Sequence, residues 1–150
     1  MSSFAPRDPD FEPRVRASFA AQRVMGTIGA TLARLAPGEV DIDLRISKEF
    51  TQQNGFVHAG IVATIADSAC GYAALSLMAP GRDVVSVEFK LNLLSPSVGE
   101  RLVARARVLR SGKTISVCRA DVSALRNGEE RLVATMLGTL MSVSEDPPPT

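Results

Sequence analysis

The segment Gln52–Tyr72, QQNGFVHAGIVATIADSACGY, is the most informative part of the sequence. It contains the only histidine, His58, and it places one carboxylate, Asp67, among small and apolar residues. An ionised side chain in an apolar helix is costly to bury unless another group uses it. The segment therefore predicts the central helix of the fold and, on the same helix, the position of the chemistry.

The size and charge of the chain limit the classes of protein to which it can belong. Its 150 residues, 45% hydrophobic and 22% charged, suit one globular domain over residues 1–150, with flexible ends at 1–10 and 144–150. The net charge of +1 gives no reason to expect binding to nucleic acid or to a membrane surface. The longest apolar run, 69–80, is too short to span a bilayer, and no signal-peptide core precedes it, so we expect a cytoplasmic protein.

The residue types that usually hold metals and cofactors are scarce. The chain has one histidine and two cysteines, Cys70 and Cys118, which stand far apart and form no ligand motif. It has no glycine loop of the phosphate-binding kind, and its 5% aromatic content is too low for a base-stacking platform. We therefore expect neither a metal nor a cofactor, and we interpret both cysteines as small buried apolar side chains.

Hydrophobic periodicity predicts an α+β domain. The predicted elements are a short helix over 12–25, strands over 28–36 and 39–47, a long helix over 59–77, and strands over 83–94, 100–110, 114–125 and 130–143. Asn127-Gly128 is a strong hairpin signal between the last two strands. One helix of about five turns cannot cover both faces of such a sheet, so we expect the antiparallel sheet to wrap around it.

Alternation along the third strand predicts which of its side chains point inward. The apolar positions share one face, which we expect to cover the central helix: Val85, Val87, Phe89, Leu91 and Leu93. Ser86 falls on the opposite face with Glu88 and Lys90, where an exposed strand serine is the simpler interpretation.

The central helix has two contrasting faces. One is apolar and is expected to be buried: Val62, Ile65, Ala66, Ala69, Ala73 and Leu77. The other is small and polar: Gly60, Thr64, Asp67, Ser68 and Gly71. A solvated stripe of this length usually carries Lys, Glu or Arg, and this one has none, so we expect it to contact a second helix or a ligand. Gly60, Thr64 and Ser68 are therefore candidates for substrate binding.

The spacing of His58 and Asp67 predicts a site shared by two subunits. The first N–H groups of a helix have no internal partner and can polarise a carbonyl oxygen. His58 and Asp67 are nine residues apart, which is roughly 13 Å along a helix axis and half a turn out of phase. One carbonyl cannot touch both groups in one chain, but an antiparallel copy of the helix would bring Asp67 toward the partner's helix start. We expect His58 to have a positioning role and Asp67 to act as a general base or a nucleophile.

These residues resemble those of the hotdog-fold, phenylacetate-pathway (PaaI-like) acyl-CoA thioesterases. The similarity covers roughly 35–143, and its most specific parts are GFVHAGIVATIADSACGYAA and VVSVEFKLNLLSPSVGERLVARARVLRSGKTISV. It implies a six-stranded antiparallel sheet wrapped around one helix, assembly into homodimers and often homotetramers, and hydrolysis of an acyl-CoA without a metal. Coenzyme A then takes part only as a portion of the substrate.

The resemblance also assigns roles to individual residues. Asp67 stands where the family has its base or nucleophile, and Ala59 stands where a glycine of the family's HGG supplies a main-chain N–H to the thioester oxygen. Ser86 matches a serine that helps to hold the attacking water. The amide that assists the carbonyl in many relatives is represented by Gln52, six residues before His58, or by Asn54.

Two functions on this fold remain as alternatives. The favoured one is hydrolysis of an aromatic or medium-chain acyl-CoA to the free acid and coenzyme A. The second is a non-catalytic module that binds acyl-CoA or fatty-acyl groups, and Asp67 in the polar stripe favours the enzyme over it. The arginine-rich strands can also hold coenzyme A phosphates, although alternation favours an outward, solvated position for these side chains: Arg101, Arg105, Arg107, Arg110 and Lys113.

Overall fold

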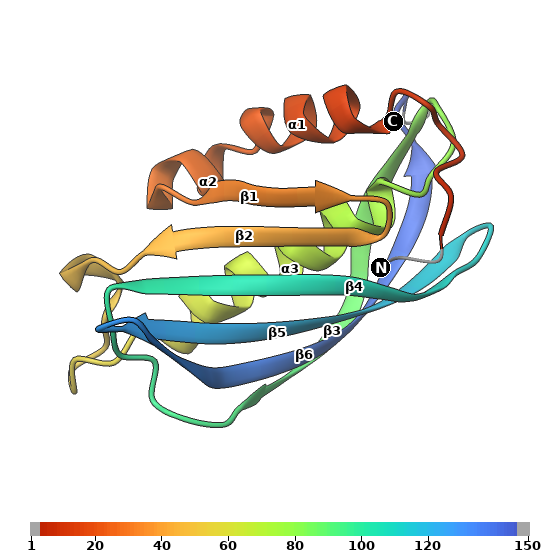
Figure 1. Ribbon diagram of the computed structural model, residues 1–150. Helices are drawn as coiled ribbons and strands as arrows, with labels where there is room; N and C mark the ends of the chain where they lie inside the picture. The colour runs from red at the N-terminus through yellow and green to blue at the C-terminus, as the bar shows by residue number, and fades with distance from the viewer. Residues whose placement is uncertain (1–3, 147–150) are drawn as a thin grey trace.

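The computed structural model of the chain describes residues 4–146, so the predicted flexible ends lie partly outside the described residues. The elements are α1 (Phe11–Ala21), α2 (Arg23–Ile28), β1 (Thr31–Ala36), β2 (Glu39–Arg45), a 3₁₀ turn (Lys48–Phe50), α3 (Ala59–Leu75), β3 (Arg82–Leu93), β4 (Arg101–Ser111), β5 (Ile115–Arg126) and β6 (Glu129–Ser144) (Figure 1). The predicted strands and central helix are all present. No helix among residues 4–146 is both long enough and apolar enough to cross a bilayer.

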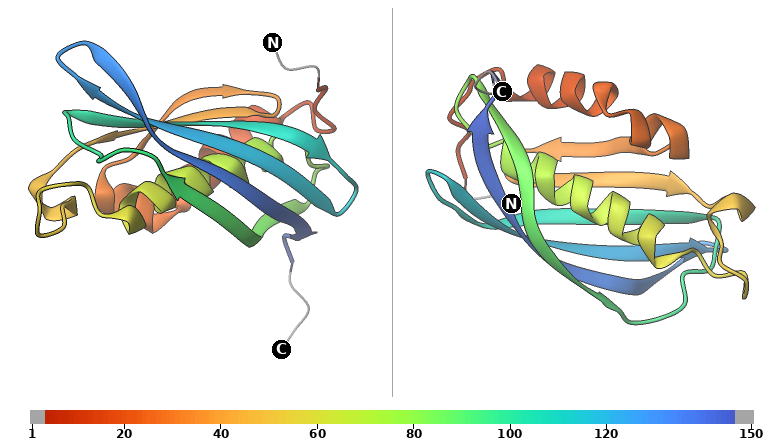
Figure 2. Two further views of the ribbon diagram at one scale, coloured as in Figure 1. Left: turned by 90° about the horizontal axis from the view of Figure 1, so that it is seen from below. Right: turned by 180° about the vertical axis from the view of Figure 1, so that it is seen from behind.

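The six strands form one antiparallel sheet in the order β1-β2-β4-β5-β6-β3. The sheet curls around α3, which lies against its concave face (Figure 2). Asn127 and Gly128 both have positive φ, 52° and 78°, and they form the predicted tight turn between β5 and β6. The expected α+β architecture, with the sheet wrapped around one long helix, is confirmed.

The core lies between α3 and the strands in the middle of the sheet. The face of α3 predicted to be buried is fully enclosed, from Val62 to Ala73. Alternate residues of β2 and β4 meet it: Val40, Ile42, Leu44, Leu102, Ala104 and Ala106. The alanines of α3 allow the helix to lie close to the sheet, and this close packing leaves the opposite face of the helix outside the core.

The N-terminal helix predicted over 12–25 is two helices, separated at Gln22. The backbone of Gln22 is extended, with φ −75° and ψ 98°, and its N–H donates to the carbonyls of Ser18 and Phe19. The chain then turns into α2, which ends at Gly29 in the left-handed conformation, φ 75°. The break allows Val15 and Met25, one from each helix, to be buried in the same core.

Arg14 joins α1 to the end of the central helix. Its guanidinium donates to the carbonyl oxygens of Leu75 and Met78, where α3 ends, and to those of Ala79 and Arg82 just beyond. Its Nε also forms a 2.9 Å ion pair with Asp8, and the two side chains are only 17% and 8% exposed. One side chain of α1 therefore binds four carbonyls at and just beyond the end of α3.

Replacing Arg14 by alanine is expected to lower the free energy of unfolding by about 3 kcal/mol, because Asp8 and the carbonyls lose their partner in a largely buried place. For a domain of this size, the melting temperature should fall by about 6–12 °C in a thermal denaturation scan. Arg16→Ala is the matched control, since within residues 4–146 Arg16 pairs only with Glu12, at the exposed surface of the same helix. Equal losses for the two variants would contradict this interpretation.

The predicted faces of β3 are wrong in the first half of the strand, up to Val87, and right for Phe89 and Leu91 beyond it. In the ladder with β6, Ser86 opposes Leu140 and Glu88 opposes Thr139, so Val87 is an extra, bulged residue. The bulge shifts the alternation by one, and Ser86 therefore shares the helix-facing side with Phe89 and Leu91. Val85 and Val87, which we expected to point inward, are 44% and 55% exposed.

Candidate active site

The start of α3 is held by His58. This residue is the N-cap, and its Nδ1 accepts a 2.8 Å hydrogen bond from the N–H of Gly60. A Cβ on Gly60 would lie only 3.0 Å from that nitrogen, so the glycine leaves room for the cap. Because the Nδ1 lone pair is already used, His58 positions the helix start, and the Gly60 N–H is not available to a ligand.

The N–H of Ala59 remains free at the helix start. The N–H groups of Ile61 and Val62 donate to the carbonyl of His58, while that of Ala59 has no acceptor within residues 4–146. Ala59 and His58 line a cavity of about 510 Å³, and its apolar wall comes from Phe56, Leu93 and Leu94. A free N–H at the positive end of a helix dipole can polarise a carbonyl oxygen placed in this cavity.

Of the two candidate amides, Gln52 lies in this cavity and Asn54 does not. The side-chain Oε1 of Gln52 accepts a short hydrogen bond from the backbone N–H of Asn54, inside a turn closed by Gly55. This contact leaves the Nε2 hydrogens of Gln52 as donors. Asn54 is exposed on the outside of the same turn. The geometry therefore favours Gln52 as the amide beside Ala59.

Asp67 and Ser86 form a second polar group. The hydroxyl of Ser86 on β3 donates a 2.7 Å hydrogen bond to Oδ1 of Asp67 on α3. Asp67 is half-buried, and the Ser86 contact is its only hydrogen bond within the described chain. Its second oxygen, Oδ2, is therefore free to accept a proton from a water molecule or to attack a carbon atom.

The two groups are not brought together within one chain. The cavity that holds Ala59 and Gln52 does not include Asp67, and the two cavities that Asp67 lines do not include Ala59. Eight residues of α3 separate them, roughly 12 Å along the helix axis. Of the other predicted binding residues, Gly60 and Thr64 lie in this interval and Ser68 directly follows Asp67; all three line a cavity with Asp67.

The hydroxyls of Thr64 and Ser68 already have partners in the chain. Thr64 donates to the carbonyl of Gly60 at 2.7 Å, and Ser68 donates to Oε1 of Gln22 at 3.3 Å. Ser68 is buried, although the helix periodicity placed it on the polar stripe. Gln22, which comes from the break between α1 and α2, lines both cavities beside Asp67 and was not predicted from the sequence.

The strand arginines are mostly paired with carboxylates on the outer face of the sheet. Arg101 pairs with Asp43, Arg105 with Glu130, and Arg107 with Asp41, as expected from alternation. The hydrogen bond from Arg105 lowers the pKa of Glu130 below its usual value. These guanidinium groups are therefore occupied within the chain.

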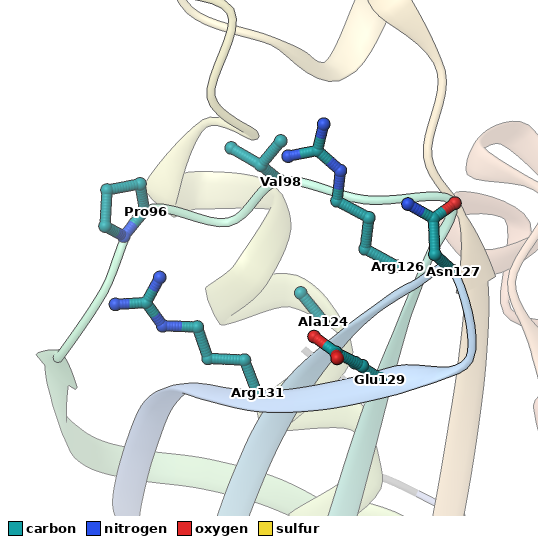
Figure 3. A pocket seen from close by; sticks show the side chains of 7 residues that line it. All are labelled: Pro96, Val98, Ala124, Arg126, Asn127, Glu129 and Arg131. Carbon is teal, nitrogen blue, oxygen red and sulfur yellow. The ribbon is translucent and has the colours of Figure 1, made fainter.

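Two other arginines line a separate cavity. Figure 3 shows Arg126 and Arg131 extending toward Val98 and Pro96 from the β5–β6 hairpin. Neither takes part in an ion pair within residues 4–146, although the carboxylate of Glu129 lies in the same cavity. The cavity shares Pro96 with the one at the start of α3. The two cavities are therefore neighbours.

Both cysteines are buried in the core. Burial raises the pKa of the Cys70 thiol strongly and that of Cys118 to about 12, so neither forms a reactive thiolate near neutral pH. In the described part of the chain, no group of three or more His, Cys, Asp or Glu side chains is arranged to hold a metal ion.

Comparisons with known proteins agree on one family. Residues 54–130 match the Thioesterase superfamily. Human acyl-coenzyme A thioesterase 13 is 35% identical over 111 residues, which cover 72% of this chain and 76% of the human protein. A thioesterase family protein from Silicibacter pomeroyi is 50% identical, with a TM-score of 0.88 over 89% of this chain and 98% of its own.

Similarity of fold extends to more distant proteins. The PaaI protein from the phenylacetic acid degradation operon of E. coli has a TM-score of 0.80 at 18% identity, over 89% of this chain and 94% of its own. At that level of identity the likeness shows the fold alone.

Proposed function

The chain belongs to the thioesterase superfamily, and we propose that it hydrolyses acyl-CoA thioesters at sites shared between two copies of the chain. The observation that carries this proposal is the separation of two complementary groups on α3. The free N–H of Ala59 lies at the start of the helix, and the Asp67–Ser86 pair lies two turns further on. Each group is half of a hydrolytic site.

Two exposed surfaces support pairing of the chains. The stripe of α3 around Thr64 and Asp67 is partly exposed and lacks Lys, Glu and Arg. Beside it, β3 is an edge strand with one side unpaired, and it exposes several apolar residues: Val85, Val87, Phe89 and Leu93. An exposed, apolar edge strand of this length is a surface that proteins normally cover. An antiparallel pairing of α3 with its copy covers the stripe and brings Asp67 of one subunit to the helix start of the other.

In this arrangement the thioester carbonyl binds at the helix start of one subunit. Its oxygen accepts hydrogen bonds from the Ala59 N–H and the Gln52 amide, which stabilise the negative charge of the tetrahedral intermediate. Asp67 of the other subunit takes a proton from water as the water oxygen bonds to the carbonyl carbon. The C–S bond then breaks, and the thiolate of coenzyme A leaves and is protonated. Direct attack by Asp67, with a mixed anhydride that water then hydrolyses, is the alternative route.

Coenzyme A extends from the helix start of the first subunit toward the β5–β6 hairpin. The pantetheine lies along Phe56, Leu93 and Leu94, and the phosphates meet Arg126 and Arg131 past Pro96. The acyl group points the other way, into the cavities beside Asp67 of the second subunit. The cavity beside Asp67 that is lined by Ser18 and Tyr72 has a volume of about 310 Å³, which suits an aromatic or medium-chain acyl group.

Replacing Arg126 or Arg131 by alanine is expected to raise KM for an acyl-CoA about five- to tenfold with little change in kcat. Each guanidinium binds a phosphate equally in the ground state and the transition state. Steady-state kinetics at two salt concentrations measures this, and the effect should shrink as the salt concentration rises. Arg101→Ala is the control, because Asp43 already occupies that guanidinium. A KM that changes equally in all three variants would contradict the assignment.

A thiol-trapping assay over a panel of aromatic and straight-chain acyl-CoAs tests the proposed function. Release of coenzyme A is read directly, because both cysteines of the protein are buried and have raised pKa values. We expect turnover for at least one aromatic or medium-chain substrate. Tight binding of acyl-CoA without release of thiol would support the non-catalytic binding module instead.

A further inference from the structure

The side chain of Gln22 connects the break in the N-terminal helices to the catalytic face of α3. Its Oε1 accepts hydrogen bonds from the hydroxyls of Ser68 and Tyr72, each at 3.3 Å. Burial raises the pKa of Tyr72, so its hydroxyl stays protonated and continues to donate. The ring of Tyr72 also contacts Phe19 of α1 edge-on, with 5.6 Å between the ring centroids. These contacts fix where the Gln22 side chain lies.

Gln22 stands between two cavities that meet beside Asp67. The first, about 410 Å³, extends toward the helix start along Gly60, Thr64 and Phe89. The second, about 310 Å³, extends the other way, toward Ser18 and Tyr72. Three residues line both cavities: Gln22, Asp67 and Ser68. Asp67 and Ser68 belong to α3. Gln22, from the break between α1 and α2, is the one residue between the two cavities that does not come from α3.

We infer that Gln22 determines acyl selectivity by limiting the size of the acyl group that can pass Asp67 into the second cavity. The inference rests on the proposed function, in which the partner's helix start holds the thioester beside Asp67 and the acyl chain points away from it, past Gln22. Residues 54–130, which match the superfamily, do not include Gln22, so membership of the family does not assign it this role.

Three variants separate the bulk of Gln22 from its hydrogen bonds. Gln22→Ala removes both the bulk of the side chain and its hydrogen bonds, and it should join the two cavities. Gln22→Met keeps a side chain of similar length that cannot accept strongly from Ser68 or Tyr72. Thr27→Ala is the matched control, because Thr27 is exposed on α2 and, among the described residues, its hydroxyl bonds only to the carbonyl of Arg23.

The experiment measures kcat/KM for butanoyl-, octanoyl-, dodecanoyl- and phenylacetyl-CoA with the parent and the three variants, after melting temperatures have shown that each is folded. We expect Gln22→Ala to raise the ratio of dodecanoyl to butanoyl at least about tenfold, as removal of a steric limit in an acyl pocket does. Gln22→Met and Thr27→Ala should keep the parent ratio within about twofold. If the role of Gln22 were merely structural, Gln22→Ala would lower kcat/KM for all four substrates by the same factor and leave the ratio unchanged.

The outcomes distinguish this inference from the proposed function. A folded Gln22→Ala variant that hydrolyses acyl-CoA with the parent's ratio overturns the assignment of Gln22 and leaves the proposed function standing. A parent protein that hydrolyses none of the four substrates overturns the proposed function, and the inference fails with it.

Discussion

Replacing Asp67 by alanine is expected to lower kcat for acyl-CoA hydrolysis at least about 10²–10³-fold, whether the carboxylate serves as the base for water or as the nucleophile. The protein should stay folded, because Asp67 is only half-buried. Its hydrogen-bond donor, Ser86, is exposed. Asp67→Asn should be similarly impaired, since the amide keeps the shape and loses the basic oxygen. Single-turnover and steady-state kinetics with a good substrate measure the loss.

The control for this variant lies on the same strand as Ser86. Glu88→Gln changes a carboxylate on the far side of the bulge, where Glu88 accepts from Thr139 of β6 and faces away from the helix. Its kcat should match that of the parent. An Asp67→Ala enzyme as fast as the Glu88→Gln enzyme would remove Asp67 from the mechanism.

Replacing Ala59 by proline is expected to lower kcat about 10²–10³-fold, the usual effect of removing one oxyanion donor. Proline lacks the N–H, and Ala59 is the first residue of α3, where proline fits a helix well. The residue before a proline prefers extended backbone, and His58 already has φ −59° and ψ 137°. The change therefore replaces the N–H donor by a ring carbon and leaves the helix in place.

Ala59→Gly is the counterpart of this variant. It retains the N–H and should keep most of the parent's kcat, and circular dichroism with a melting curve should show both variants folded. A proline variant that turns over like the glycine variant would mean that the Ala59 N–H does not stabilise the thioester oxygen.

Local pattern was sufficient to predict the framework of the fold. Val40, Ile42 and Leu44 alternate with polar residues and are all buried in β2, and Asn127-Gly128 forms the turn that its sequence indicates. The apolar face of α3 is buried as its 3.6-residue period requires. In these segments, local preference and tertiary packing favour the same structure.

The features that the sequence did not predict depend on contacts between distant segments. No glycine marks the bulge at Val87. The sequence therefore predicted unbroken alternation along β3 and placed Ser86 on the face away from the helix. Gln22 breaks the first helix without a proline or glycine at the break, and its role follows from contacts with Ser68 and Tyr72 in α3. Arg14 belongs to no motif, and its role follows from the hydrogen bonds that its guanidinium donates to four carbonyls at and beyond the end of α3.

Within the candidate site, residue types and their spacing pointed to the candidate groups but not to their surroundings. The distance between Asp67 and the helix start follows from helix geometry alone, and the structure keeps the two groups in separate cavities. Gln52 and Asn54 could be separated only once the turn was known, because that turn directs Gln52 into the cavity and leaves Asn54 outside it. Arg126 and Arg131 flank a hairpin turn and carry no motif, so only their position beside Pro96 marks them.

A hybrid of two inactive variants tests most directly whether each site takes residues from two subunits. Asp67→Ala and Ala59→Pro chains with different affinity tags are co-expressed, and dimers that carry both tags are isolated. One of the two sites in such a hybrid unites the intact Asp67 of one chain with the intact Ala59 N–H of the other. We predict about half of the parent's kcat per dimer, although each variant alone is nearly inactive. Activity in the hybrid no greater than that of the two separate variants would contradict the shared site.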